Sequence, residues 1–226
     1  RSENLLAVCR LLQMVNSEAE RLLTAAADIG IDLSDHQTAQ LLSYLDLLEK
    51  WNNAYNLTAV RSRSEMLSRH LVESLAISPF ISGKQVVDVG TGAGLPGIPL
   101  AIANPAVHYT LLDSNGKKSR FLLEVKRALM LSNVEIETVR VESWLPTKRF
   151  DSVVTRAFAD LATTLVRVDH VLTDQGMVYA MKTQQAQHEI ESLANATRQV
   201  TAQSITVPGR DWSFQLLAVQ PRAAAL

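Results

Sequence analysis

The spacing of apolar residues divides the chain into two parts with different secondary structure. Up to about Phe80 the apolar side chains recur at intervals of three and four residues, as the leucines do within residues 41–48. This is the spacing of one face of an amphipathic helix. Residues 1–82 are therefore predicted to form an N-terminal helical subdomain, with helices near Asp35–Trp51 and Arg63–Ile77.

Two short polar motifs predict where these helices begin. Ser34 is followed by Gln37, and Ser62 by Glu65, each at the spacing of a capping box. In that motif the serine and the residue three positions later each bond the backbone of the other. We expect both pairs to form such caps.

From Gly83 onward, short β-rich runs alternate with helical segments, which predicts a mostly parallel sheet covered by helices on both faces. The last two runs are separated by little more than Pro208 and Gly209, which predicts a closing antiparallel hairpin. Residues 83–226 are therefore expected to form one α/β domain with a seven-stranded sheet. The predicted strands are Gln85–Val89, His108–Asp113, Val134–Val141, Asp151–Thr155, Gly176–Met181, Ser204–Val207 and Phe214–Val219.

Composition and charge narrow the class of protein. The formal net charge is −1, so any contact with nucleic acid must come from local clusters of lysine and arginine. Cys9 is the only cysteine, which excludes an internal disulfide and a cysteine-based metal centre and fits a reducing cytosol. The chain has no run of 18 apolar residues and no recognisable leader cleavage site. We expect a cytoplasmic protein with no membrane span and no metal.

The first predicted strand ends in a glycine-rich loop, DVGTGAGLPG, over residues 88–97. Glycines let the chain turn sharply and bring its backbone against a ligand at the carboxyl end of the sheet. A dinucleotide fold would need its third glycine where Leu95 stands, and the Gly-Lys-Ser/Thr of a phosphate loop is missing. Both phosphate-binding interpretations are therefore weakened.

An acidic residue, Asp113, ends the second predicted strand. A nucleoside with a free ribose needs an acceptor for its two hydroxyls at this position. The loop glycines Gly90 and Gly92 together with Asp113 indicate a pocket for S-adenosylmethionine, and the carboxylate of Asp88 can meet the positive amino group of the methionine moiety. The alternative is that the glycines serve only a tight turn and that the two acids cap neighbouring backbone.

The chain carries an ordered set of motifs: WNNAYNLT at residues 51–58, His70, DVGTGAGLPGIPLAI at 88–102, LLDS at 111–114 with Lys117 and Lys118, RVE at 140–142, and TRAF at 155–158. With this set the chain resembles the glucose-inhibited division protein B family, the 16S rRNA guanine-N7 methyltransferases. The resemblance spans about residues 33–182 and departs at Glu73, where the family usually has Asp, and at Thr183, where Gly is common.

This resemblance implies a Rossmann-like, class I S-adenosylmethionine-dependent methyltransferase fold. It also implies that Gly90 and Leu95 line the cofactor, that Val141 and Glu142 flank its adenine, and that Arg156 lies beside its methionine end. Taken alone, Val141 and Glu142 would equally suit a strand end with an exposed acid. Arg156 would equally suit a salt bridge to a nearby acid.

The kind of methyl transfer can be narrowed by the motifs that the sequence lacks. Methylation of a pyrimidine at C5 needs a nucleophile such as a thiolate, and Cys9 is far from the pocket in sequence. Enzymes that methylate exocyclic amines typically carry an Asn/Asp-Pro-Pro-aromatic run where this chain has residues 155–158. Guanine N7 already has a free lone pair and needs alignment rather than a base. These absences are compatible with N7, and the target itself, guanine N7 in 16S rRNA, is what the family resemblance implies.

A basic cluster follows Asp113 at the start of the next predicted helix, where the helix dipole disfavours cations. RNA phosphates would offset this cost, although a solvated basic face is the alternative. Phe158 can stack on an extruded purine or belong to the core. The predicted partner is 16S rRNA or the small ribosomal subunit particle, and the competing hypotheses are a small-molecule or protein methyltransferase and a non-catalytic S-adenosylmethionine-binding ribosome factor. The predicted RNA contacts are Lys117, Lys118, Arg120, Asn56, His70 and Lys182.

Overall fold

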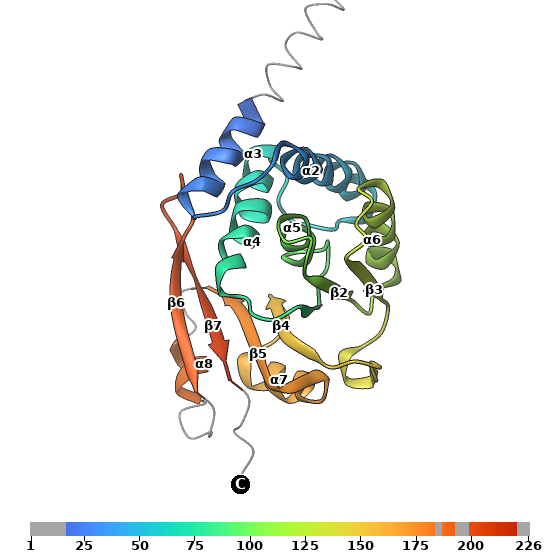
Figure 1. The fold of residues 1–226 in the computed structure, drawn as a ribbon, viewed down its shortest axis with the longest axis vertical. Helices are drawn as coiled ribbons and strands as arrows, with labels where there is room; N and C mark the ends of the chain where they lie inside the picture. Colours follow the sequence, from blue (N-terminus) through green and yellow to red (C-terminus); the bar gives the residue numbers. More distant parts are fainter. Residues whose placement is uncertain (1–16, 184–186, 193–198, 221–226) are drawn as a thin grey trace, which may run out of the picture.

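A computed structural model describes residues 17–183, 187–192 and 199–220 (Figure 1). Seven strands form one sheet in the order β3-β2-β1-β4-β5-β7-β6. The first five strands along the chain are parallel, and β7 runs antiparallel to both β5 and β6. The predicted α/β fold is confirmed. The strands are β1 Gln85–Val89, β2 His108–Leu112, β3 Val134–Glu137, β4 Phe150–Arg156, β5 Leu172–Lys182, β6 Val200–Thr206 and β7 Ser213–Val219.

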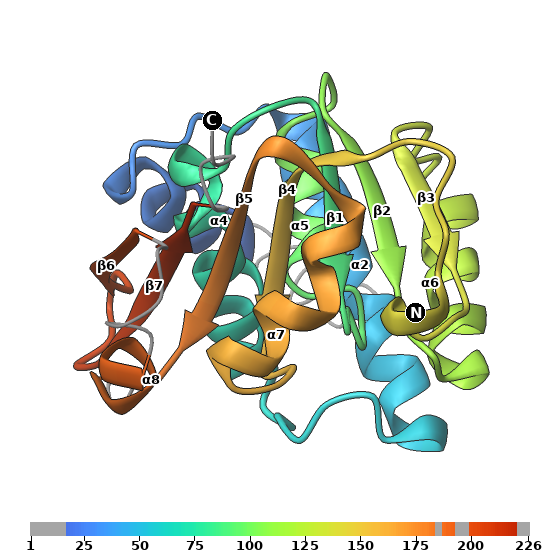
Figure 2. The same cartoon turned by 90° about the horizontal axis from the view of Figure 1, so that it is seen from below.

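Helices cover both faces of the sheet, as Figure 2 shows for α7 on one face and α2, α4 and α5 on the other. The first helix of the described residues spans 17–28. The other α-helices are α2 Asp35–Tyr55, α3 Arg63–Met66, α4 Glu73–Ala76, α5 Gly97–Ala103, α6 Gly116–Ala128, α7 Leu161–Val168 and α8 Gln187–Ser192, with 3-10 turns at Ser78–Phe80, Val141–Ser143 and Asp169–Val171.

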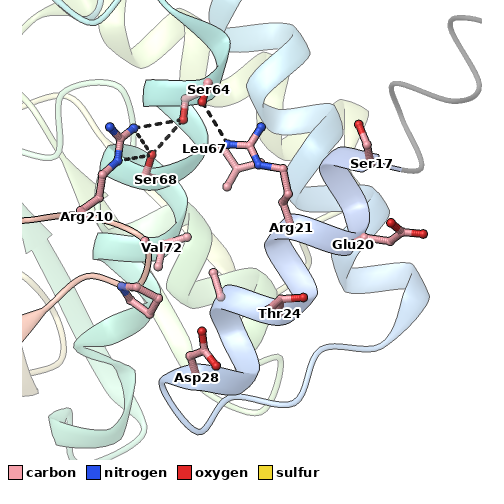
Figure 3. A pocket seen from close by; sticks show the side chains of 13 residues that line it. Ser17, Glu20, Arg21, Thr24, Asp28, Ser64, Leu67, Ser68, Val72 and Arg210 are labelled. Carbon is pink, nitrogen blue, oxygen red and sulfur yellow. Dashed lines mark hydrogen bonds between the residues drawn. The ribbon is translucent and has the colours of Figure 1, made fainter.

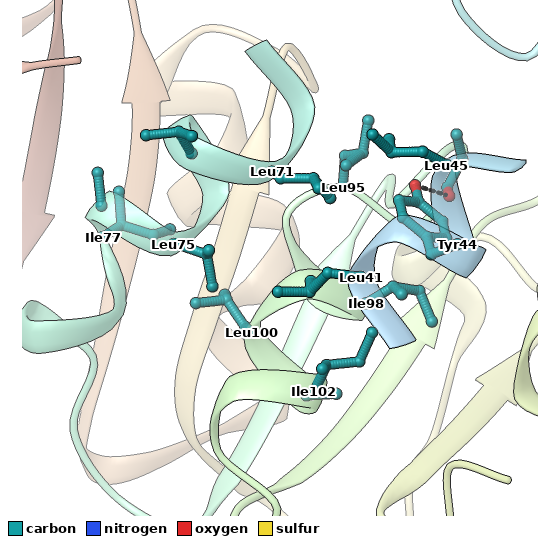
Figure 4. Close-up of a cluster of buried hydrophobic side chains, with 14 of the residues drawn as sticks. Leu41, Tyr44, Leu45, Leu71, Leu75, Ile77, Leu95, Ile98, Leu100 and Ile102 are labelled. Carbon is teal, nitrogen blue, oxygen red and sulfur yellow. Dashed lines mark hydrogen bonds between the residues drawn. The ribbon is translucent and has the colours of Figure 1, made fainter. Parts of the chain in front are cut away.

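The N-terminal helices share a hydrophobic core with one face of the sheet. Leu41 and Leu45 of α2 and Leu71 before α4 are buried in the same cluster as Leu100 of α5 (Figure 4). Polar contacts add to this packing, because Gln37 donates hydrogen bonds to the last carbonyls of α5. The proposed boundary between residues 82 and 83 stays a prediction, and the parts on its two sides pack tightly together.

One predicted cap is confirmed and the other is wrong. Ser34 and Gln37 bond each other's backbone at the start of α2. Ser62 precedes α3, but its side chain makes no capping bond. The helix predicted near residues 63–77 is present, although its middle turn, Leu67–Val72, is a π-helix between α3 and α4. Such wide turns are rare and often lie at functional sites.

Three strands differ in length from the prediction by three residues or more. The third ends at Glu137, and Val141 begins a 3-10 turn instead. The fifth starts at Leu172, and its register shifts opposite Phe150, so its first residues lack the regular alternation of a strand. The sixth covers Val200–Thr206, most of which is exposed on the sheet edge and carries no apolar pattern. Among the described residues, no helix combines the length and apolar character that crossing a membrane requires.

Candidate functional site

The glycine loop turns sharply between β1 and α5. Gly90, Gly92 and Gly94 all have positive φ, at 71°, 62° and 90°. A Cβ added to Gly90 would lie 2.6 Å from Cδ2 of Phe158. At this position both the backbone conformation and the close approach of the aromatic ring therefore favour glycine.

Asp88 of β1 is fully buried and accepts a hydrogen bond from this loop. Its Oδ2 accepts hydrogen bonds from Thr91 Oγ1 at 2.7 Å and from the Gly97 amide at 2.8 Å. Its Oδ1 is also buried but has no hydrogen-bond partner among the described residues. Burial raises the pKa of Asp88 to about 7, against the opposing effect of the two hydrogen bonds. One oxygen thus caps the loop, and the other is left for a further donor.

Asp113 follows β2 and faces the loop across the pocket. Its Oδ2 accepts from the Gly92 amide at 3.0 Å and from Lys118 Nζ at 3.2 Å, while its Oδ1 accepts from the Asn115 amide at 2.8 Å. A carboxylate offers about four acceptor positions, so three are in use. Lys118, predicted as an RNA contact, instead reaches into the pocket.

A cavity of about 310 Å³ lies at the carboxyl ends of these strands, the place where open α/β sheets bind ligands. Its volume is within the range of about 300–1,000 Å³ typical of ligand pockets. The structure brings four of the predicted cofactor residues together around it: Gly90, Asp113, Val141 and Glu142.

Phe158 and Arg167 also line this cavity, although the sequence did not assign them to the cofactor. Arg167 of α7 pairs with Glu142 at 2.9 Å, and its guanidinium carbon lies 5.7 Å from the ring centre of Phe158. Phe158 in turn packs against Gly90. The TRAF motif already contained Phe158, but nothing in the sequence linked Arg167 of the next helix to it.

Three predicted cofactor residues have side chains or backbone engaged elsewhere. Leu95 is buried in the cluster between the loop and the N-terminal helices, where Figure 4 shows it near Leu71. Gly92 contributes its amide to Asp113. Arg156, at the end of β4, pairs with Glu73 at 2.7 Å and donates to the carbonyl of Arg69 at 2.9 Å. Burial raises the pKa of Glu73, and the charge of Arg156 opposes that rise.

The predicted RNA contacts differ in the exposure of their side chains. His70 is 3% exposed and shares a 2.9 Å hydrogen bond with Thr58 Oγ1. Burial lowers the pKa of His70 to about 4, which keeps the ring neutral at pH 7. Lys182 donates to the carbonyl of Ala159 and pairs with Glu189 at 2.8 Å. In this structure the side chains of His70 and Lys182 therefore make contacts within the protein.

The exposed candidates are Asn56, Lys117 and Arg120. Asn56 ends α2 in the left-handed conformation and accepts a hydrogen bond from Arg61. The side chain of Asn115 caps α6 by accepting from the Lys117 amide, and the first turn contains no acid. Lys117 and Arg120 thus face solvent while Lys118 turns inward.

Two sequence-based expectations concern metals and thiols. Within residues 17–183, 187–192 and 199–220, no group of three or more His, Cys, Asp or Glu side chains is arranged to hold a metal ion. Cys9 lies outside the described residues.

A larger cavity, of about 630 Å³, lies between the first helix, the helix over residues 63–72 and the turn before β7 (Figure 3). Arg21 and Arg210 donate hydrogen bonds to Ser64 and Ser68 at its border. No residue predicted for the cofactor or RNA lies in it. The hydrogen bonds of Arg210 at this border connect the turn before β7 to the helix over residues 63–72.

The GidB family model, described as rRNA small subunit methyltransferase G, matches residues 37–212. The chain belongs to this family. The family resemblance drawn from the motifs is thereby confirmed.

Three curated relatives agree with the family match, and each is named ribosomal RNA small subunit methyltransferase G. The protein of Saccharophagus degradans is 50% identical over 175 residues, covering 77% of this chain and 78% of the relative. That of Nitrosococcus oceani is 43% identical, covering 87% and 92%. That of Escherichia coli strain K12 is 44% identical, covering 85% and 93%.

Solved structures show the same fold at low sequence identity. A magnesium protoporphyrin IX methyltransferase from Synechocystis, solved with bound SAM, has a TM-score of 0.55 at 13% identity and covers 78% of this chain and 96% of its own. A methyltransferase from Geobacter sulfurreducens has a TM-score of 0.56 at 15% identity, covering 88% and 96%. The predicted class I methyltransferase fold is confirmed.

Proposed function

We propose that this chain transfers the methyl group of S-adenosylmethionine to N7 of a guanine in the 16S rRNA of the small ribosomal subunit. The observation that carries the proposal is the meeting of Gly90, Asp113, Val141 and Glu142 around one cavity at the strand ends. The names of the relatives support ribosomal RNA as the substrate. Such a substrate would place the enzyme in the cytoplasm.

The residues around the cavity suit S-adenosylmethionine. Asp113 is the acceptor for the ribose hydroxyls, and Val141 supplies an apolar surface for the adenine, with Glu142 beside it. The orphaned, buried Oδ1 of Asp88 suits the cationic amino group of the methionine moiety. When bound, the cofactor supplies an electrophilic methyl group. Two ribose hydroxyls on Asp113 require Lys118 to release its oxygen, because three of about four acceptor positions are in use.

The task of the protein in this reaction is to position the two reactants. Guanine N7 carries its own lone pair, so no side chain has to remove a proton before attack, and alignment supplies the rate enhancement. The residues lining the cavity include neither a histidine nor a cysteine. A mechanism without a general base fits this environment.

Transfer of a tritiated methyl group to unmodified small-subunit RNA tests the proposal, with the labelled nucleoside identified after digestion. We expect 7-methylguanosine. Asp113→Ala should abolish cofactor binding and transfer, whereas Cys9→Ser should retain full activity. A methylated pyrimidine, or loss of activity in a folded Cys9→Ser protein, would refute the chemistry.

The same assay distinguishes the proposed function from both competing functions. A non-catalytic ribosome factor would bind S-adenosylmethionine and leave the RNA unlabelled, and a small-molecule or protein methyltransferase would do the same with RNA as acceptor. Offering naked RNA and assembled 30S particles in parallel identifies the form of the substrate. We expect labelling to be confined to guanine in either form.

A further inference from the structure

A second cavity adjoins the cofactor cavity and has a volume of about 770 Å³. Ala157, just after β4, lines both cavities, so the two cavities border on the same residue. Ala157 has a positive φ of 51°, which is unusual for a residue with a side chain. A ligand in the second cavity would therefore lie next to one bound in the first.

An aromatic side chain and a cation line this second cavity together. Trp212, just before β7, is half-buried. The guanidinium carbon of Arg69 lies 5.7 Å from the centre of its ring. Arg69 belongs to the π-helix, whose wide turn also presents the Arg69 carbonyl to Arg156. An aromatic ring beside a cation is the combination that binds single-stranded nucleic acid, because every base offers a flat face and every nucleotide a phosphate.

The charges of the cavity favour an anion. Three basic side chains and one acidic side chain line it. Glu73 neutralises Arg156, and Glu189 neutralises Lys182. Arg69 is exposed and forms no ion pair with any carboxylate in the described part of the chain. Its positive charge is the one left for a ligand.

We propose that this second cavity receives the nucleotide that accepts the methyl group, with Trp212 stacking on its base and Arg69 binding a neighbouring phosphate. The inference rests on the proposed function, because it takes guanine in RNA as the acceptor. It adds the place of that guanine and two residues that the motifs did not indicate.

Fluorescence tests the stacking contact independently of catalysis. The chain has three tryptophans, so Trp51→Phe/Trp144→Phe leaves Trp212 as the only one. Unmodified 16S rRNA transcript, added in the presence of S-adenosylhomocysteine, should quench Trp212 emission, and quenching should weaken as salt rises. No quenching at RNA concentrations that saturate binding would overturn the proposal.

Kinetics supply the second test. Trp212→Ala should raise the KM for RNA about tenfold, because stacking contributes about 1–3 kcal/mol per base, and should leave S-adenosylmethionine affinity unchanged. Trp212→Phe should recover most of the loss. Phe80→Ala is the matched control, since Phe80 is 41% exposed and precedes β1 at the opposite end of the sheet. A thermal melt shows whether each variant is folded. If Trp212→Ala does not fold, the fluorescence test alone decides the proposal.

The charge contact has its own control. Arg69→Gln should reduce the slope of log affinity against log salt by about 0.7, the value for one phosphate of a single strand. Lys84→Gln, an exposed charge at the start of β1, should leave the slope unchanged. If wild type labels guanine while Trp212→Ala and Arg69→Gln match their controls, the cavity assignment fails and the proposed function stands. If wild type labels no RNA, the proposed function fails, and quenching still judges the cavity.

Discussion

Tyr44 of α2 donates a hydrogen bond from its hydroxyl to the backbone carbonyl of Ala93 in the glycine loop, at 2.8 Å. Tyr44 is fully buried, and burial raises the pKa of its hydroxyl far above the usual value. The hydroxyl therefore remains a donor throughout the physiological pH range. The N-terminal helices thus reach the cofactor loop through a specific polar contact as well as through packing.

Tyr44→Phe should destabilise the protein by about 1–3 kcal/mol, because the Ala93 carbonyl would be left buried without its donor. S-adenosylmethionine affinity should fall as well, since the loop loses a fixed point. Urea unfolding and calorimetric titration measure the two effects. Tyr55→Phe, which alters a tyrosine that is 41% exposed, is the control. Equal stability of the two variants would show that the hydrogen bond contributes nothing.

The raised pKa of Asp88 should make the free energy of unfolding depend on pH. Its folded pKa of about 7 lies above the ordinary value of 3.8, so the folded state prefers the protonated carboxyl. This contribution is fully present below about pH 4 and is lost as pH rises to about 7. The loss should be on the order of a few kcal/mol, because one pKa unit corresponds to about 1.4 kcal/mol.

Asp88→Asn should remove this loss, so the variant should gain stability relative to wild type as pH rises between those limits. The amide oxygen can still accept from Thr91 and Gly97. Unfolding curves at closely spaced pH values give the comparison. Asp174→Asn, which alters a carboxylate whose side chain is 92% exposed, serves as the reference. Parallel pH profiles for wild type and Asp88→Asn would contradict the prediction.

Gly90 allows backbone strain to be separated from steric conflict. Gly90→Ala places a Cβ 2.6 Å from the Phe158 ring at a φ of 71°, whereas Gly30→Ala meets no atom within 4 Å at a φ of 75°. Gly30→Ala should cost about 1–2 kcal/mol from the left-handed conformation alone. Gly90→Ala should cost more and should weaken S-adenosylmethionine binding strongly.

Removing the ring should relieve only the steric part. Gly90→Ala should therefore cost less stability in a Phe158→Ala background than in wild type, measured by thermal melting of the double variant and both single variants. The residual cost should match that of Gly30→Ala. If the double variant is no better than the sum of the single variants, the ring is not what excludes a side chain at Gly90.

The basic cluster of α6 should separate into two functions. Lys117→Gln/Arg120→Gln removes two exposed charges and should weaken RNA binding, lower its salt dependence and spare cofactor affinity. Lys118→Gln should change S-adenosylmethionine affinity instead, because Lys118 occupies an oxygen of Asp113. Titration of each variant with cofactor and with RNA tests this. If all three substitutions weakened RNA binding and none changed cofactor affinity, the predicted division between Lys118 and the other two residues would be wrong.

The sequence predicted those parts of the site that depend on where strands end. The loop after β1 and Asp113 after β2 must lie at one edge of a parallel sheet, so Gly90 and Asp113 could be placed together from the strand pattern alone. Val141 also reaches the cavity, although its strand ends earlier than predicted.

The parts that could not be predicted depend on contacts between distant elements. Lys118 turns inward because Asp113 is within reach of its long side chain, and the charge pattern alone could not show that choice. Arg156 pairs with Glu73 and donates to the carbonyl of Arg69 in the π-helix, and no local sequence pattern indicates either contact. The edge strand β6 is mostly polar, so the apolar alternation that revealed the buried strands was missing there.

The order of strands in the sheet also sets the order in which the enzyme can become complete during its synthesis. Among the described strands β7 is the last to be synthesised, yet it lies between β5 and β6, and the segment before it contains Trp212 and Arg210. A nascent chain that stops before residue 210 already holds the glycine loop and Asp113 but lacks one wall of the second cavity. The proposed cofactor residues Gly90 and Asp113 are thus synthesised before the second cavity can be completed, because that cavity needs the segment that contains Trp212.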